Sequence, residues 1–177
     1  LGMLSGDVHG IDTDERGIGF AKLITGLEHL RVVDGRTIPF RDKTFDTVFL
    51  IETLEHIHPD EIPGTIAEIA RVLKDDGQLV ITVPSTRMVN KPGSKHYQHF
   101  TPASLQNAVA TEFVADIFGQ NRAGFHLLKV FYKLLDNPLW FIRPMAAWYN
   151  LRIWPRFFNT CSAEKGNRLM ALCKKNG

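Results

Sequence analysis

The chain has 177 residues, of which 44% are hydrophobic, and a formal net charge of +2 at pH 7. This length and composition suit a single domain with a sizeable core. The near-neutral charge argues against a concentrated basic surface, so we expect no nucleic-acid partner. No run of about 18 apolar residues is present, which excludes a membrane-spanning helix. The first residues lack the basic and apolar regions of a signal peptide.

The two cysteines, Cys161 and Cys173, show no spacing that is typical of metal ligands. Isolated thiols in a cysteine-poor chain are usually reduced and are common in cytoplasmic proteins. We therefore expect free thiols and a cytoplasmic location.

The first part of the chain predicts a strand, a helix and a second strand. Residues 8–12 are a short apolar run that ends in an acid. Residues 13–15 supply an N-cap and a negative first turn for a helix from Glu15 to near Thr25. Residues 30–33 predict the next strand, which Asp34 and Gly35 close. The apolar residues of the helix are Ile18, Phe20, Leu23 and Ile24.

The middle of the chain predicts a parallel βαβ unit. Residues 45–51 are apolar on both faces, as in a central strand that is covered by helices on either side. Pro59 suits the first turn of a helix that continues to the stop signal at residues 75–77. Residues 78–83 predict the following strand. Ligands bind beyond the carboxyl ends of parallel strands, so four polar residues should share one rim: Glu52, Glu55, His56 and Ser85.

The last third of the chain predicts one more helix and two strands. Thr101 and Pro102 are the N-cap and first residue of the helix. Residues 113–118 and 168–173 predict the strands. Six strands that are mostly separated by helices indicate an α/β fold of the doubly wound type.

Between those two strands, residues 121–163 form an aromatic and basic helical insert. Residues 125–158 contain all three tryptophans and five basic residues against one acid, Asp136. Three interpretations stay open: a lid or apolar substrate pocket, a peripheral membrane surface, and a homodimer contact.

Taken together and in order, these motifs resemble the class I S-adenosylmethionine-dependent methyltransferases of the small-molecule branch. The matching stretches are VHGIDTDE, VVDGRTIPF, FDTVFLIETLEHI, EIARVLKDDGQLVITVP and RLMALCKK. Several motifs in the family's order are more specific than any single one. The resemblance implies one methyltransferase-like domain over residues 1–177. Its sheet is expected to be Rossmann-like and mostly parallel, with an antiparallel last strand.

The resemblance also implies a cofactor, S-adenosylmethionine, with S-adenosylhomocysteine as its product. Asp12 would bind the ribose hydroxyls, because a carboxylate at a strand end offers two acceptor oxygens. Asp34 and Gly35 would lie beside the adenine, and Ile38 would pack against it. The methionine part of the cofactor would contact Glu52, Thr53 and His56.

Methyl transfer is a direct displacement, so a protein contributes mainly alignment and removal of the acceptor's proton. His96 and His99 are the candidate catalytic residues, since histidine accepts protons near neutral pH. They lie in a loop with Pro92 and Gly93 that is placed to close over the site. The alternative for both histidines is local hydrogen bonding. Four histidines lie at short spacings without a defined ligand set, which predicts no metal site: His56, His58, His96 and His99.

One part of the family pattern is missing. The family begins with a strand and a glycine-rich GxGxG loop, of which only Gly2 is a candidate remnant. The missing strand would lie in mid-sheet, and its absence would leave neighbouring backbone groups unpaired, at about 1–3 kcal/mol for each buried group. We therefore expect residues upstream of Leu1, another chain, or a rearranged sheet to fill this position.

The leading functional prediction is a methyltransferase that acts on a small-molecule or lipid-linked acceptor. The alternative is a methyltransferase-like binding or scaffold domain without catalysis, because the glycine-rich loop is not seen. A nicotinamide-dependent dehydrogenase is also compatible with Asp12. However, the LEHI and RVLKDDG motifs and the antiparallel last strand argue against it.

Overall fold

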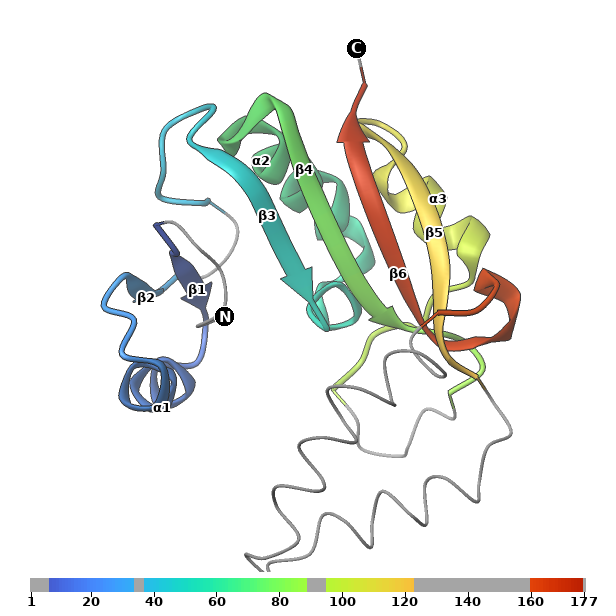
Figure 1. Ribbon diagram of the computed structural model, residues 1–177, viewed down its shortest axis with the longest axis horizontal. Helices are drawn as coiled ribbons and strands as arrows, with labels where there is room; N and C mark the ends of the chain where they lie inside the picture. Colours follow the sequence, from blue (N-terminus) through green and yellow to red (C-terminus); the bar gives the residue numbers. More distant parts are fainter. Residues whose placement is uncertain (1–6, 34–36, 89–94, 123–159, 177) are drawn as a thin grey trace, which may run out of the picture.

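The computed structural model describes residues 7–33, 37–88, 95–122 and 160–176. Six strands and three α-helices are found in these residues, with short 3-10 helices between them (Figure 1). In chain order the elements are β1 (Gly10–Asp12), α1 (Glu15–Thr25), β2 (Leu30–Val32), β3 (Phe45–Ile51), η1 (Leu54–His56), η2 (Pro59–Glu61), α2 (Ile62–Val72), β4 (Leu73–Pro84), α3 (Pro102–Val109), β5 (Phe113–Arg122), η5 (Ala163–Lys165) and β6 (Gly166–Lys175).

The strands form two separate sheets. β1 and β2 pair in parallel, with Gly10 opposite Leu30. The larger sheet has the order β3-β4-β6-β5. β3 and β4 are parallel, whereas β6 runs antiparallel to both of its neighbours. The predicted α/β fold with an antiparallel last strand is confirmed.

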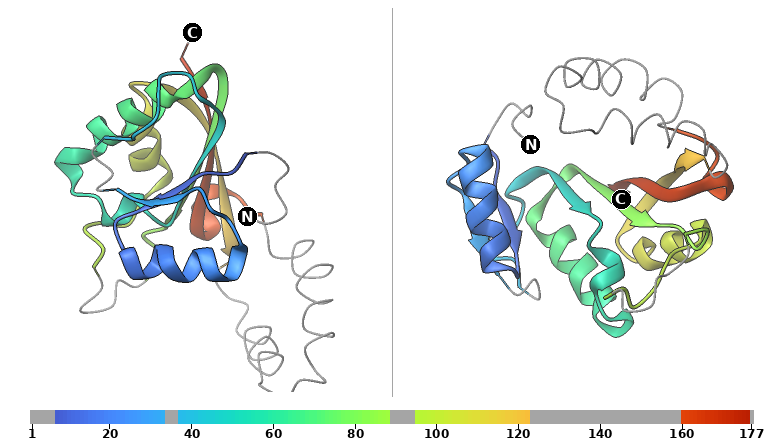
Figure 2. Two further views of the ribbon diagram at one scale, coloured as in Figure 1. Left: turned by 90° about the vertical axis from the view of Figure 1, so that its left-hand side faces the viewer. Right: turned by 90° about the horizontal axis from the view of Figure 1, so that it is seen from below.

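The division into two sheets falls between β1 and β3, where the sequence predicts a missing strand. Within the described residues no ladder joins β1 to β3, so each of these strands has one edge without a partner. The expectation that β3 is a central strand covered on both faces is therefore wrong. Phe49 and Ile51 are 45% and 51% exposed, because β3 is an edge strand and α2 and α3 lie on one face of its sheet (Figure 2).

The hydrophobic core fills the space between the four-stranded sheet and these two helices. Every second residue is fully buried from Leu79 to Val83 of β4 and from Leu169 to Cys173 of β6, as expected where one face of a sheet packs against helices. Burial raises the pKa of the Cys173 thiol to about 12. Both cysteines are free thiols, as predicted. The strand residues that form this core layer are Leu79, Ile81, Val83, Leu169, Ala171 and Cys173.

Helix α1 begins and ends where the sequence predicts. The Asp14 side chain accepts a hydrogen bond from the backbone N–H of Arg16, and Gly26 ends the helix with a φ of 67°. Of its apolar residues only Ile18 is buried, and Leu23 is 82% exposed. The small β1–β2 sheet therefore offers α1 a narrow packing surface.

The other two helices differ in how well their ends follow the prediction. α3 has the predicted N-cap, Thr101, which forms a capping box with Ser104. α2 ends at Val72, before the predicted stop at residues 75–77. Leu73 instead pairs with Phe45 and extends β4 backwards across an irregularity in the β3–β4 register. Pairing to a neighbouring strand thus overrides the local turn signal.

An ion-pair network fixes the segment before β3 against α2. The Glu68 carboxylate accepts hydrogen bonds from the Arg71 guanidinium and from the backbone N–H of Ile38. Arg71 also donates to the backbone carbonyls of Ile38 and Phe40 and to the Asp42 carboxylate. These hydrogen bonds, those from Arg71 first, lower the pKa of Glu68 to about 2.

This network predicts a loss of stability in acid. The pKa of Glu68 is lower in the folded chain than its ordinary value of 4.5, so its contribution is complete above that pH and is lost as the pH falls towards 2. Urea unfolding at pH 6, 4 and 3 should show a smaller loss of stability for Glu68→Gln than for the wild type. An identical loss in both proteins would contradict the prediction.

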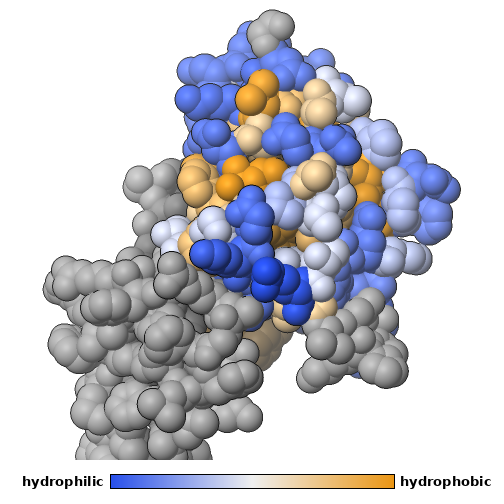
Figure 3. Space-filling model, turned by 90° about the vertical axis from the view of Figure 1, so that its right-hand side faces the viewer, coloured by the Kyte–Doolittle hydropathy of each residue, from blue (hydrophilic) through white to orange (hydrophobic). Residues whose placement is uncertain are grey.

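The described surface shows no wide apolar belt on the side of β5. Figure 3 shows apolar residues interspersed with hydrophilic ones on that side. Among the described residues, no helix is both long and apolar enough to cross a membrane.

Candidate functional site

Polar residues gather at the carboxyl ends of β1, β3 and β4. Asp12 is the last residue of β1, Glu52 follows β3, and Ser85 follows β4. The parallel pairing of β3 with β4 sets Ile51 opposite Thr82, which places the ends of these strands close together. The predicted rim is therefore present.

Asp12 lies in a tight turn before α1. Its Oδ1 accepts a hydrogen bond of 2.9 Å from the backbone N–H of Asp14, and Asp14 rather than Asp12 caps the helix. The Asp12 side chain is exposed. Its second carboxylate oxygen has no hydrogen-bond partner in the part of the chain that the structure describes. Asp12 therefore keeps acceptor capacity for a ligand.

Glu52 has an unusual backbone conformation at the end of β3. Its φ of 47° lies in the left-handed region, which non-glycine residues rarely adopt. Its N–H donates to the Thr82 carbonyl at 2.9 Å. The Arg168 guanidinium lies 3.3 Å from Oε2, while Oε1 is buried without a hydrogen-bond partner in the described part of the chain. Such strain is often concentrated at functional sites.

Arg168 was not among the predicted site residues. The antiparallel register sets Arg168 opposite Pro84, which brings the start of β6 to the rim. The sequence motif RLMALCKK contains this residue, but only the strand register could reveal its contact with Glu52.

The 3-10 helix η1 connects the rim to the core. Leu54 is completely buried in the hydrophobic core, and Glu55 is 1% exposed. Thr53 donates its hydroxyl proton to the Ile51 carbonyl, and His56 is exposed. Oε2 of Glu55 is buried and has no hydrogen-bond partner within the described ranges. Burial, assisted by the charge of Glu52, raises the pKa of the Glu55 carboxyl group.

The loop that contains the predicted catalytic histidines is attached to η1. The backbone N–H of Tyr97 donates to the Glu55 carbonyl at 2.8 Å, and Phe100 makes backbone hydrogen bonds to Pro84 and Thr86. Residues 95–100 are thus held against the rim. Pro92 and Gly93, the predicted hinge residues, lie outside the described residues.

A chain of hydrogen bonds determines the protonation pattern of the histidines in their neutral form. Nδ1 of His99 lies 3.1 Å from the Met88 carbonyl, and Nδ1 of His96 lies 3.0 Å from Nε2 of His99. Because a carbonyl only accepts, His99 donates from Nδ1 and its Nε2 accepts from His96. Nε2 of His96 therefore carries a lone pair. Burial, with the nearby His56 and His99, lowers the pKa of His96.

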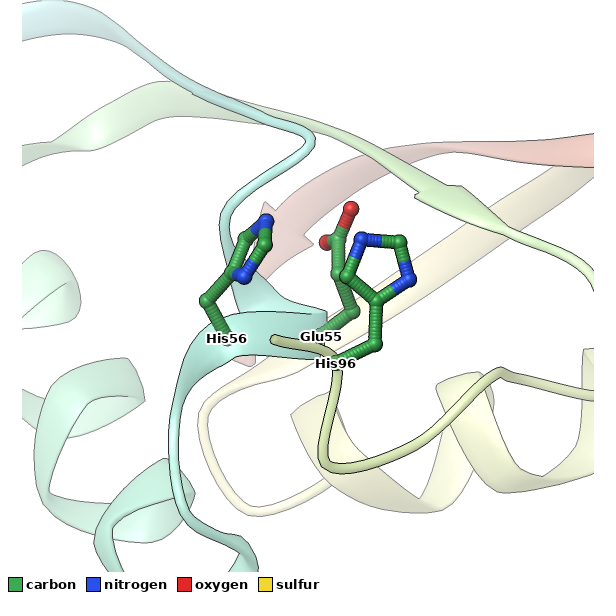
Figure 4. A group of neighbouring side chains, drawn as sticks. All are labelled: Glu55, His56 and His96. Atoms are coloured by element: carbon green, nitrogen blue, oxygen red, sulfur yellow. The ribbon is translucent and has the colours of Figure 1, made fainter. Parts of the chain in front are cut away.

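The same argument applies to His56. Its Nδ1 lies 3.2 Å from the Lys95 carbonyl, so that nitrogen donates and Nε2 keeps its lone pair. One ligand atom each of Glu55, His56 and His96 lies within 4.8 Å of the others. Figure 4 shows the two rings on either side of the Glu55 carboxyl group. The rings are nearly perpendicular, with centroids 4.7 Å apart.

A cavity of about 550 Å³ opens between the β1–α1 turn and this histidine cluster. This volume is within the usual range for small-molecule pockets. Its walls combine residues far apart in the sequence: Thr13, His56, Lys95, His96 and Tyr97. Of these, Thr13, Lys95 and Tyr97 were not predicted as site residues, because the cavity depends on how the loop meets the turn.

The remaining predicted site residues are not at this cavity. Ile38 is buried in the hydrophobic core beside α2, where it does not line the cavity. Its predicted contact with adenine stays a prediction. The predicted cofactor-binding residues Gly2, Asp34 and Gly35 lie outside the described residues, as does the aromatic and basic segment 125–158.

Comparison with known families identifies part of the chain. The family model described as "Methyltransferase domain" matches residues 1–81. This match includes β1, β3 and η1, and with them Asp12 and the Glu52–His56 stretch. No curated protein matches the chain.

Solved structures share the fold at low sequence identity. A SAM-dependent methyltransferase from Thermotoga maritima, described as a possible histamine N-methyltransferase, is 12% identical with a TM-score of 0.64 over 96% of this chain and 73% of that chain. A SAM-dependent methyltransferase from Methanosarcina mazei is 15% identical with a TM-score of 0.59, and the match covers 96% of this chain and 81% of that chain. The [4+2]-cyclase SpnF is 18% identical with a TM-score of 0.57, and the match covers 96% of this chain and 66% of that chain. The chain is therefore similar to a methyltransferase domain over residues 1–81, and it shares its fold with solved structures of S-adenosylmethionine-dependent methyltransferases.

Proposed function

We propose that the chain binds S-adenosylmethionine and transfers its methyl group to a small-molecule or lipid-linked acceptor. The observation that carries the proposal is the cavity where the turn after Asp12 meets η1 and the histidine loop. Thr13, which directly follows the exposed Asp12, lines this space together with His56 and His96, and the space is large enough for a nucleoside cofactor.

The residues around the cavity suit the polar groups of this cofactor. The free oxygen of Asp12 suits a ribose hydroxyl, in line with the use of strand-end acids in dinucleotide folds. Glu52 offers a carboxylate for the cationic amino group of the methionine part; Thr53 follows it directly, and His56 lies four residues further along. When bound, S-adenosylmethionine supplies an activated methyl group on a sulfonium.

His96 is the proposed proton acceptor for a hydroxyl substrate. It lines the cavity, and its hydrogen bond to His99 leaves a lone pair at Nε2. Its lowered pKa keeps the ring neutral near pH 7, which is the state that accepts a proton. His99 would then act as a positioning residue, because its own Nδ1 is committed to the Met88 carbonyl.

The class of acceptor is inferred from the composition of residues 125–158. Tryptophans beside lysines and arginines suit an apolar substrate pocket, and they also suit peripheral contact with a membrane surface or a homodimer interface. A lipid-linked acceptor would use both an apolar substrate pocket and peripheral contact with a membrane surface. A cytoplasmic location follows from the expected reduced thiols.

A binding or scaffold domain without methyl transfer is the second candidate. Two observations favour it: β1 and β3 lack ladder partners on their facing edges within the described residues, and one structure of the same fold is named as a [4+2]-cyclase. One fold can host more than one reaction, so the function is inferred from the residues of the site and not from the fold.

A labelling experiment separates the two candidates. The chain is incubated with methyl-tritiated S-adenosylmethionine and either a water-soluble metabolite extract or a lipid extract. We expect label in one extract, and less label with Asp12→Asn. Cofactor binding without label in either extract would contradict methyl transfer and support the binding domain.

A further inference from the structure

Three side chains converge at the rim, and the proposed function gives no role to one of them, Glu55. Glu55 and His56 come from η1, and His96 comes from the loop after β4. One ligand atom from each lies within 4.8 Å of the other two. Together they offer one carboxylate oxygen and two imidazole nitrogens, all of which are metal-ligand atoms.

The state of each ligand atom is the one that a metal ion requires. Nδ1 of His56 donates to the Lys95 carbonyl, and Nδ1 of His96 donates to His99, so each ring has its lone pair at Nε2. Metal-binding histidines commonly donate their other ring N–H to a carbonyl or another acceptor, which fixes the ring. Both histidines already have this partner.

Glu55 supplies an independent observation. Its side chain is 1% exposed, and Oε2 is buried without a hydrogen-bond partner among the residues that the structure describes. A buried polar atom without a partner costs about 1–3 kcal/mol, so native structures rarely contain one without a reason. A cation bound to this oxygen would remove that cost.

We propose that Glu55, His56 and His96 form a binding site for a divalent first-row transition-metal ion, for which Zn²⁺ is the probe. Ligand atoms arranged tetrahedrally at about 2.0–2.2 Å from Zn²⁺ are about 3.4 Å apart. The three ligand atoms here lie up to 4.8 Å apart, so binding must bring them closer together by about an ångström or somewhat more. The site is open on the cavity side, because His56 and His96 line the cavity. Water or an acceptor oxygen completes the coordination there.

The nature of the donors determines which ions bind. Imidazole nitrogen suits Zn²⁺, Cu²⁺, Fe²⁺ and Ni²⁺, whereas Mg²⁺ prefers an all-oxygen shell. The site also joins η1 to the 95–100 loop, in addition to the hydrogen bond from Tyr97 to Glu55. A bound ion and a proton compete for the same nitrogen of His96, so His96 does not act as a base while an ion is bound.

Calorimetric titration of the chain with Zn²⁺ alone tests the site. We expect one ion per chain, with affinity reduced at least about 10-fold by Glu55→Gln and by His96→Ala. His58→Ala is the matched control, because His58 lies two residues from His56, is exposed, and caps η2 outside the cluster. It should bind Zn²⁺ like the wild type. Mg²⁺ should bind far more weakly.

Two further readouts keep the test independent of folding and of the cofactor. Circular dichroism establishes whether each variant is folded. If Glu55→Gln does not fold, the Zn²⁺ titration of His96→Ala decides the test. Zn²⁺ should raise the midpoint of thermal unfolding of the wild type and of His58→Ala but not of His96→Ala. No saturable Zn²⁺ binding, or equal binding by the folded variants, would overturn the proposal. Because no cofactor is added, this result stands apart from the methyl-transfer test.

Discussion

Leu54→Ala will lower the free energy of unfolding by about 3 kcal/mol, within the usual range of about 2–5 kcal/mol for a buried leucine. Leu54 is completely buried at the start of η1 and belongs to the main hydrophobic core. Its truncation removes apolar contacts and leaves a cavity. Urea unfolding followed by circular dichroism measures the change.

Leu23→Ala is the matched control for this prediction. Leu23 lies in α1 and is 82% exposed, so the same substitution should change stability by less than about 0.5 kcal/mol. A loss of comparable size in both variants would mean that burial at η1 does not support the rim. The contrast matters for the site, because Leu54 directly precedes Glu55 and His56.

Asp12→Asn will weaken binding of S-adenosylhomocysteine by about 10- to 100-fold, the effect of losing a hydrogen bond to a charged group worth about 1.5–3 kcal/mol. Asparagine retains an oxygen that can accept from the Asp14 N–H, so the turn before α1 is preserved. What it removes is the charge and the second acceptor oxygen. Isothermal titration calorimetry gives both dissociation constants.

Asp14→Asn provides the comparison. It removes one negative charge two residues away, and asparagine is as good an N-cap as aspartate. The cap that Asp14 provides to Arg16 should therefore remain, and affinity should stay within about threefold of the wild type, a difference of about 0.6 kcal/mol. Equal weakening by both variants would indicate a general charge effect and not a contact from Asp12.

Local patterns predicted most elements of the fold. Residues 45–51 form β3 as expected, and Thr101 begins α3 as its N-cap. The end of α2 was missed because Leu73 pairs with Phe45, a contact that depends on the tertiary structure. The burial of β3 was also missed, since the position of a strand at an edge or in the centre depends on which neighbours the sheet contains.

Only part of the site could be predicted, because some of its contacts also depend on the tertiary structure. The position of Glu52 at the end of a strand follows from the βαβ pattern. By contrast, the meeting of Glu55 with His96 depends on a backbone hydrogen bond from Tyr97 to the Glu55 carbonyl. A contact of this kind has no residue signature, so the spacing of the histidines alone could not predict it. The Glu52–Arg168 pair likewise depends on the β4–β6 register.

The most direct test of the central claim is calorimetric titration of the unmodified chain with S-adenosylhomocysteine and, separately, with a nicotinamide dinucleotide. The cavity between the Asp12 turn and the histidine cluster predicts saturable binding of S-adenosylhomocysteine at one site per chain, and weaker binding of the dinucleotide. Heat from the dinucleotide alone, or no binding of S-adenosylhomocysteine, would contradict it.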